Sequence, residues 1–293
     1  MSLPSEKLPP EPQSVPFAVV PRTGLPDPLE AGIRLPTRFI RLWDVITATV
    51  DVRACALMAF CGGWLVFTQI HCTLGAFDRD IKPRIADWNP YLKPIFAHLY
   101  WFLCGPIVLF LIPLLLGCWL LKVKPADLGA GLGNWRSGLK WTLGIFAGFL
   151  PVVITVSFFD AFKRTYPMNG WAGTEAVNYF TGKGGSVLPI LIYELAYGLY
   201  FIGWEFFFRG FMGFGLFRTL GWYSVLVATI PFAVMHVGKP EPEALGSVVA
   251  GIALGIFALK ERSFLYGALL HMLVAWSMDI LAITHKVRDA LGK

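Results

Sequence analysis

Residues 187–210, VLPILIYELAYGLYFIGWEFFFRG, form an apolar stretch with three charged side chains, Glu194, Glu205 and Arg209. About 20 apolar residues, rising about 1.5 Å each in a helix, cross the hydrocarbon core of a bilayer. A charge at the centre of such a helix costs roughly 2.5–3.5 kcal/mol on insertion scales and usually faces a protein interior or a water-filled cavity. The stretch therefore predicts a membrane-spanning helix that carries a buried polar site.

The composition of the whole chain also indicates a membrane protein. Of its 293 residues, 56% are hydrophobic and 15% are charged, and the mean hydropathy is +0.60. Soluble domains carry about 25% charged residues, so a soluble protein is a poor fit. The net charge of +6 is spread without a run of Lys and Arg, which argues against a nucleic-acid partner. It fits loops that face anionic lipid head groups, so the expected surroundings are a lipid bilayer.

Further apolar stretches predict the rest of the fold. Together with residues 187–208 they predict an all-α, polytopic transmembrane helical bundle of about seven spans, within a range of six to eight. An eighth span would require the segment 161–180 to re-enter the membrane. The distribution of Lys and Arg only slightly favours an N-terminus on the inner side. The other six stretches are 54–77, 94–121, 141–159, 220–238, 244–259 and 263–283.

The chain divides into a tail, one membrane domain and a short end. Residues 1–36 contain nine prolines and few apolar residues, which predicts a disordered Pro-rich tail. Residues 37–284 are expected to form the membrane-embedded helical domain, entered through a short interfacial helix at 38–53. Residues 285–293 are expected to form a short C-terminal tail.

Two other groups of residues are expected to serve packing. All five cysteines lie in apolar stretches without CxxC spacing, so neither a disulfide framework nor a thiolate zinc site is predicted. A stripe of small residues, spaced four apart, would let two helices approach closely. The cysteines are Cys55, Cys61, Cys72, Cys104 and Cys118, and the stripe is Ser247, Gly251 and Gly255.

Candidate catalytic side chains lie in three different apolar stretches. Glu205 and Arg209 are four residues apart and share a helix face, where they can form an ion pair that serves structure alone or supports a site. His236 and His271 follow in later stretches. A carboxylate with a neutral imidazole can hold and deprotonate a water, while a second imidazole donates to a developing oxyanion. No cofactor is favoured, although Glu205, His236 and His271 could also form a zinc site with an open position.

Three more acids accompany this set. Glu194 precedes Glu205 by eleven residues, or about 16.5 Å along a helix, so the two cannot form a carboxylate dyad. Glu194 is expected to line the cavity mouth or to pair with a neighbour. Glu243 is expected either to stabilise a helix N-terminus or to lie at the cavity rim near His236. Asp279 is expected near the membrane surface.

At these residues the sequence resembles the CPBP family of intramembrane proteases over residues 125–284. The family includes the type II CAAX prenyl endopeptidases and bacterial proteins linked to bacteriocin processing and immunity. Its first motif is two glutamates, three variable residues and an arginine, and here Trp204, Glu205 and Arg209 occupy those positions. Its second and third motifs, Phe then His and His then Asn at four-residue spacing, are matched by Phe232 with His236 and by His271 with Ala275.

The resemblance implies an intramembrane endopeptidase that acts on a peptide or membrane-protein substrate in the bacterial inner membrane. In this hypothesis Glu205 and His236 hold the attacking water, His271 stabilises the oxyanion and Arg209 positions Glu205. Nothing in the sequence specifies a prenylated substrate.

Two departures from the family pattern keep other functions open. Trp204 replaces the first glutamate, and Ala275 replaces the asparagine that helps to form an oxyanion hole. A catalytically degenerate membrane scaffold or immunity-type protein is therefore the main alternative. A transporter, in which Glu194, Glu205 and the histidines relay protons, is a further one.

Overall fold

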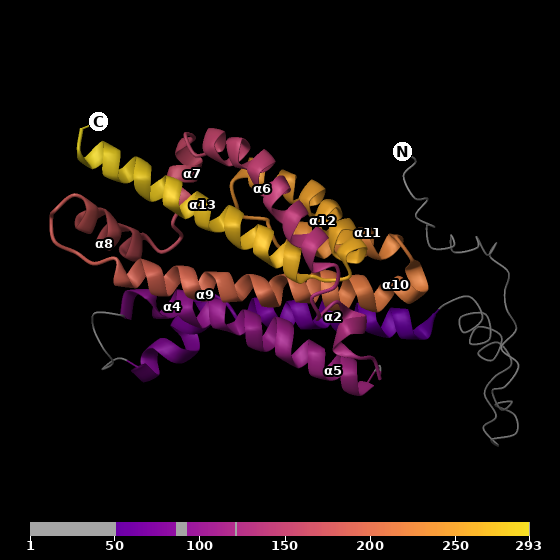
Figure 1. Ribbon diagram of the computed structural model, residues 1–293. Coiled ribbons are helices and arrows are strands. Elements are labelled where there is room, and N and C mark those ends of the chain that lie inside the picture. Colours follow the sequence, from indigo (N-terminus) through magenta and orange to yellow (C-terminus); the bar gives the residue numbers. More distant parts are fainter. Residues whose placement is uncertain (1–50, 86–92, 121, 293) are drawn as a thin grey trace, which may run out of the picture. The chain divides into compact units, whose positions relative to one another are not determined.

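The computed structural model describes residues 51–85, 93–120 and 122–292, and every regular element in these ranges is a helix (Figure 1). The predicted tail at 1–36, and all but the last residues of the predicted interfacial helix at 38–53, lie outside the described residues. The all-α, multi-pass fold class is confirmed for the described ranges.

Six of the predicted spans form helices that are long and apolar enough to cross a membrane. Two of them continue through π-helical segments, which join α4 to α5 and α9 to α10. The elements of these spans are α2 (Val52–His71), α4 (Lys93–Cys104), η3 (Gly105–Leu111), α5 (Ile112–Leu120), α6 (Trp135–Val156), α9 (Leu188–Glu205), η5 (Phe206–Phe214), α10 (Gly215–Leu220), α12 (Glu241–Glu261) and α13 (Leu265–Ala290).

The stretch 220–238 was predicted to form a seventh span, but its helix is too short to cross the membrane. Its helix α11 (Tyr223–Val234) has 12 residues, or about 18 Å, against a hydrocarbon core of about 30 Å. The stretch is shorter as a helix because turns occupy both ends: Gly221 has a positive φ of 53°, and the chain turns again after Val234. Six spans lie within the predicted range.

The remaining connections are short helices. The segment 161–180, considered as a possible re-entrant span, forms α7 (Asp160–Thr165) and α8 (Gly170–Phe180), which are too short to cross. At the C-terminus, α13 continues to Ala290, into the predicted tail 285–293. The other short elements are α3 (Leu74–Ala76), η1 (Phe77–Ile81), η2 (Lys82–Ile85) and η4 (Pro125–Leu128).

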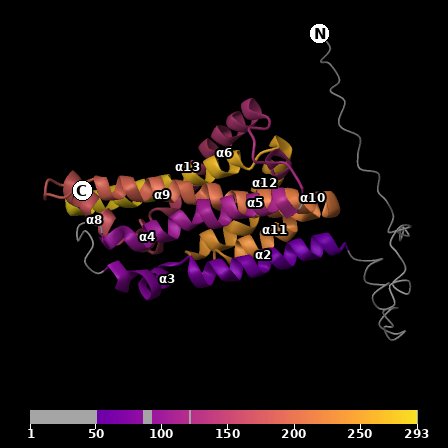
Figure 2. The same ribbon diagram turned by 90° about the horizontal axis from the view of Figure 1, so that it is seen from below.

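The chain separates into the units Met1–Ala56 and Leu57–Lys293. In the first unit, the described residues form the start of α2, where the Asp51 carboxylate accepts a hydrogen bond from the Arg53 backbone N–H at 2.9 Å. In the second unit, α9 is central, with α13 along one side and α4 along the other (Figures 1 and 2). The apolar window of the helix 188–220 is 61% buried, against 11% for that of α6.

Glycines permit the closest helix contacts. A Cβ built on Gly203 of α9 would lie 2.1 Å from the carbonyl oxygen of Gly105, so these two backbones touch. In the small-residue stripe, a Cβ on Gly251 would lie 2.7 Å from Thr229, and one on Gly255 2.7 Å from Val225. The predicted packing role of the stripe is therefore confirmed for the α11–α12 contact.

We expect Gly203→Ala to destabilise the fold by about 1–3 kcal/mol, because the added methyl group would collide with the Gly105 carbonyl. Thermal unfolding of the detergent-solubilised protein, followed by circular dichroism, measures the change. The matched control is Gly144→Ala on α6, where a Cβ meets nothing within 4 Å and no loss is expected. Equal midpoints for the two variants would contradict the close contact.

Candidate functional site

The site centres on a buried ion pair where α9 ends. Glu205 is the last residue of α9, and the helix then widens into the nine-residue π-helix η5, which carries Arg209. Such π-helical segments occur frequently at functional sites. Glu205 is fully buried and Arg209 is 3% exposed. Arg209 Nε lies 3.1 Å from Glu205 Oε2, so the predicted pair forms.

His271 of α13 meets the other oxygen of the same carboxylate. Its Nδ1 lies 2.9 Å from Glu205 Oε1. Because an ionised carboxylate only accepts hydrogen bonds, Nδ1 must carry the hydrogen. The imidazole also stacks on Phe201, with ring centroids 4.2 Å apart. Gly267 allows this approach, since a Cβ there would lie 3.1 Å from Glu205 Oε2.

His236 lies in the turn after α11, next to Phe232. Its Nδ1 is 2.7 Å from the Phe232 carbonyl oxygen, which can only accept, so Nδ1 is again the donor. The Phe232 ring lies 4.6 Å from the His236 ring and 6.3 Å from that of His271. The Arg209 guanidinium sits 3.9 Å from the same ring. Phe232 therefore contacts His236 and Arg209 and lies close to His271.

The two positions that depart from the family pattern are both buried. Trp204 is 6% exposed, and its indole meets the His236 ring edge-on at 5.9 Å. Its Nε1 has no hydrogen-bond partner. Ala275 lies one turn after His271 and contributes only a methyl group, 5% exposed. An apolar surface thus occupies both positions at which the family pattern has polar side chains.

Comparison with protein families identifies this region. Residues 186–277 match the family model for the type II CAAX prenyl endopeptidase Rce1-like proteins. This segment is therefore similar to the Rce1-like proteins. It contains Glu205, Arg209, His236 and His271, so the predicted resemblance to the CPBP family is confirmed over the part that carries the site. No curated protein and no solved structure matches the chain significantly.

The zinc site that Glu205, His236 and His271 could form by sequence stays a prediction. The Glu205 carboxylate already faces Arg209 and His271. Within the described residues, no three His, Cys, Asp or Glu side chains converge in a way that could hold a metal ion.

A second buried polar contact joins the same two helices. The helices α9 and α13 run antiparallel, and Trp276 Nε1 donates to the Glu194 carbonyl at 3.1 Å. On these two helices, Glu194 Oε2, both carboxylate oxygens of Asp279 and the Tyr193 hydroxyl are buried without a hydrogen-bond partner among the described residues. The two roles expected for Glu194, lining a cavity mouth or pairing with a neighbour, stay predictions.

Asp279, which was expected near the membrane surface, is fully buried in the protein. It lies near the middle of the 26-residue helix α13, which continues beyond the apolar stretch 263–283 to Ala290. Its depth in the membrane stays a prediction.

Glu243 lies in the first turn of α12, as the helix N-terminus hypothesis predicts. It is also held by side chains: the Tyr166 hydroxyl donates to its Oε2 at 2.5 Å, and Lys239 Nζ lies 3.9 Å from its Oε1. Burial raises the pKa of the Tyr166 hydroxyl well above its usual range. Sequence analysis missed Tyr166, because no local pattern links residue 166 to residue 243.

We expect Glu205→Gln to cost about 3–5 kcal/mol of stability, because it leaves the Arg209 charge buried without a counter-ion. Unfolding in detergent measures the loss. In the double variant Glu205→Gln with Arg209→Met, the loss should be smaller than the sum of the two single losses.

The matched control for this cycle is the pair Lys82–Asp78, which has the same four-residue spacing. Its side chains are 58% and 56% exposed, so Asp78→Asn should not change the unfolding midpoint measurably. Additive losses at Glu205 and Arg209 would show that these side chains do not interact.

Proposed function

We propose that the protein is an intramembrane endopeptidase of the bacterial inner membrane, with His271 as the general base. The observation that supports this most is the 2.9 Å contact between His271 Nδ1 and the fully buried Glu205 carboxylate. A buried carboxylate that accepts from Nδ1–H fixes the imidazole in the tautomer whose Nε2 lone pair can take a proton.

His271 acts twice in the proposed reaction, first as a base and then as an acid. His271 Nε2 accepts a proton from a water as the water attacks the carbonyl carbon of the peptide bond. The protonated imidazole then returns the proton to the leaving amine when the tetrahedral intermediate collapses. Arg209 balances the charge of Glu205 throughout.

This proposal changes the role of Glu205 from the sequence-based hypothesis. Its two oxygens face Arg209 and His271, and its side chain has no exposed surface with which to hold a water. Glu205 is therefore better suited to position His271 than to activate the water directly. His236 has the same tautomer, fixed by the Phe232 carbonyl, and is the second proton acceptor near the site.

The proposed substrate is a peptide or a membrane-protein segment. The matching family model is that of prenyl endopeptidases, and the proposal does not extend to a prenylated substrate. No step of this proposal uses a metal ion, because no three His, Cys, Asp or Glu side chains of the described residues converge in a way that could hold one.

We expect His271→Ala to slow peptide-bond hydrolysis by roughly 10²–10⁴-fold, the usual contribution of a general base. Membrane vesicles with the full chain are incubated, and new peptide N-termini are quantified by mass spectrometry. Added imidazole should restore part of the rate to this variant. His285→Gln on the same helix, where the ring contacts Ser157, is the matched control and should keep the rate. Unchanged cleavage in His271→Ala would refute the proposal.

A second candidate function is a catalytically degenerate membrane scaffold or immunity-type protein with the same fold. The specific observation in its favour is the burial of Trp204 against His236, at the position of the first-motif glutamate. In that case the Glu205, Arg209 and His271 contacts serve stability alone.

Restoring the family pattern distinguishes the two candidates. The endopeptidase proposal expects vesicles with the natural chain to release peptides. In that case peptide release does not depend on the double variant Trp204→Glu with Ala275→Asn. The scaffold alternative expects release only from the double variant. The same quantification of new N-termini measures both.

A further inference from the structure

The start of α6 is joined to the turn between α12 and α13 by hydrogen bonds. The Asn134 backbone N–H donates to the Glu261 carbonyl at 2.9 Å, and the Asn134 side-chain amide donates to the Lys260 carbonyl at 3.2 Å. The Ser137 hydroxyl donates to Glu261 Oε1 at 3.0 Å. Gly133 permits this contact, since a Cβ there would lie 2.1 Å from the Glu261 carbonyl oxygen. The first turns of α6 and the end of α12 therefore lie side by side.

Four basic side chains belong to the two segments in contact. Arg136 and Lys140 are four residues apart and share a face of α6. Lys260 and Arg262 flank Glu261 in the chain. All four are exposed, and none forms an ion pair with an acidic side chain of the described residues. We call these four residues the basic patch.

Acidic side chains do not neutralise the basic patch. The segments 122–140 and 255–270 contain two acids, Asp127 and Glu261. The Asp127 carboxylate lies 3.7 Å from Arg218 Nη2, outside the patch. Glu261 is 7% exposed and accepts from Ser137, so its carboxylate lies beneath the surface. The exposed charge of the patch is therefore positive.

The basic patch lies at the end of a membrane span. Helix α6 has 22 residues, and its apolar window is only 11% buried, so most of its surface is available to lipid. Trp135 is exposed at its start, with the Arg136 guanidinium 5.3 Å from the ring centroid. Exposed tryptophans concentrate at the level of the lipid head groups. Exposed apolar side chains, such as Trp141 and Leu143, follow along the helix and are available to acyl chains.

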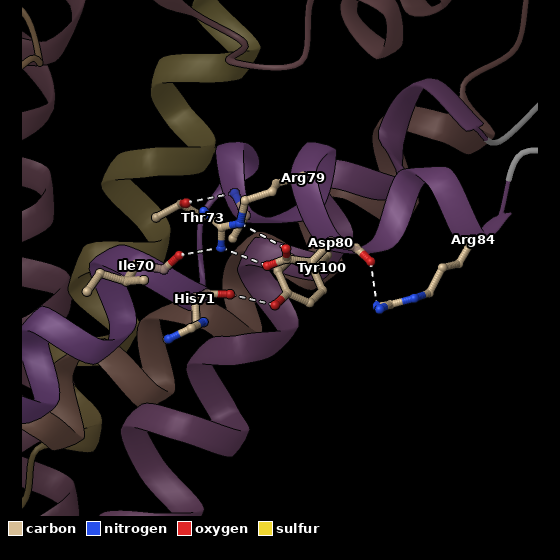
Figure 3. A network of polar contacts seen from close by, with 8 residues as sticks. Ile70, His71, Thr73, Arg79, Asp80, Arg84 and Tyr100 are labelled. Atoms are coloured by element: carbon tan, nitrogen blue, oxygen red, sulfur yellow. Dashed lines mark hydrogen bonds and ion pairs between the residues drawn. The ribbon is translucent and has the colours of Figure 1, made fainter.

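The basic residues that follow α2 have different surroundings. Arg79 Nη2 lies 2.7 Å from Asp80 Oδ2, and Lys82 Nζ lies 2.9 Å from Asp78 Oδ1. Figure 3 shows the first of these pairs together with Arg84, whose Nη1 donates to the Asp80 carbonyl at 2.6 Å. Acceptors within the protein already engage these three cations. An external phosphate would have to displace them, whereas no carboxylate has to be displaced at the basic patch.

We propose that the basic patch binds the head group of an anionic phospholipid. The phosphate oxygens accept charge-assisted hydrogen bonds from Arg136 and Lys140 on one side and from Lys260 and Arg262 on the other. The acyl chains lie along the exposed apolar side chains of α6. A zwitterionic head group brings its own cation, which the patch repels. The bound lipid links α6 to the α12–α13 turn, and its binding does not depend on the proposed hydrolysis.

The test uses the full chain in detergent micelles, titrated with phosphatidylglycerol or with phosphatidylcholine of identical acyl chains. Native mass spectrometry counts the bound lipids and gives a dissociation constant for each. We expect the natural chain to bind phosphatidylglycerol about 10-fold more tightly or better. A phosphatidylglycerol with a photoreactive diazirine in its acyl chain should label peptides of α6.

Two triple variants locate the site. Arg136→Gln with Lys140→Gln and Lys260→Gln should weaken phosphatidylglycerol binding by about 10–100-fold and remove the photolabel from α6. The matched control removes the same number of charges from the region after α2 and should keep the affinity. Its substitutions are Arg79→Gln, Lys82→Gln and Arg84→Gln. Unfolding midpoints in phosphatidylcholine show whether both variants fold.

Three results would overturn the proposal. The first is equal affinity of the natural chain for the two lipids, which needs no variant. The second is an equal loss of affinity in the two triple variants, which would indicate attraction by net charge alone. The third is displacement of the lipid by glycerol 3-phosphate at the same concentration, which would indicate a site for a soluble phosphate.

Discussion

The buried carboxylate of Glu205 is the constraint on which the arrangement of the other helices depends. An unpaired charge inside a membrane domain is strongly unfavourable, so compensating groups must reach it from the protein itself. Arg209 compensates from the next turn, and His271 does so from α13. The second contact requires α13 to lie directly against the end of α9. Once these helices are fixed, the antiparallel contact at Glu194 and Trp276 follows further along the same interface.

Close approach to Glu205 in turn requires small residues and a locally altered helix. Gly267 leaves room for the carboxylate against α13, and Gly203 lets α9 touch the backbone at Gly105 on its other side. The π-helix η5 begins directly after Glu205, so Arg209 lies on a widened turn. These features weaken α9 as an isolated helix, because glycine and π geometry are intrinsically unfavourable. Packing of the most buried span in the described chain must compensate for that cost.

The sequence predicted the features that depend on local pattern. Apolar length identified the spans, and four-residue spacing identified the Glu205–Arg209 pair. It could not determine where helices stop within an apolar stretch, so α11 was predicted too long. Contacts between distant segments, such as Tyr166 with Glu243, leave no local signal.

The tryptophan at position 204 gives the two histidines different surroundings. A glutamate there would add a second carboxylate next to Glu205, while Arg209 supplies one positive charge. The indole avoids that repulsion, but it leaves His236 with an aromatic edge and a backbone carbonyl as partners. Of the two histidines, only His271 has a carboxylate within hydrogen-bond distance, and that buried negative charge would stabilise its imidazolium during proton transfer. The proposed general base therefore lies on α13 rather than in the turn after α11.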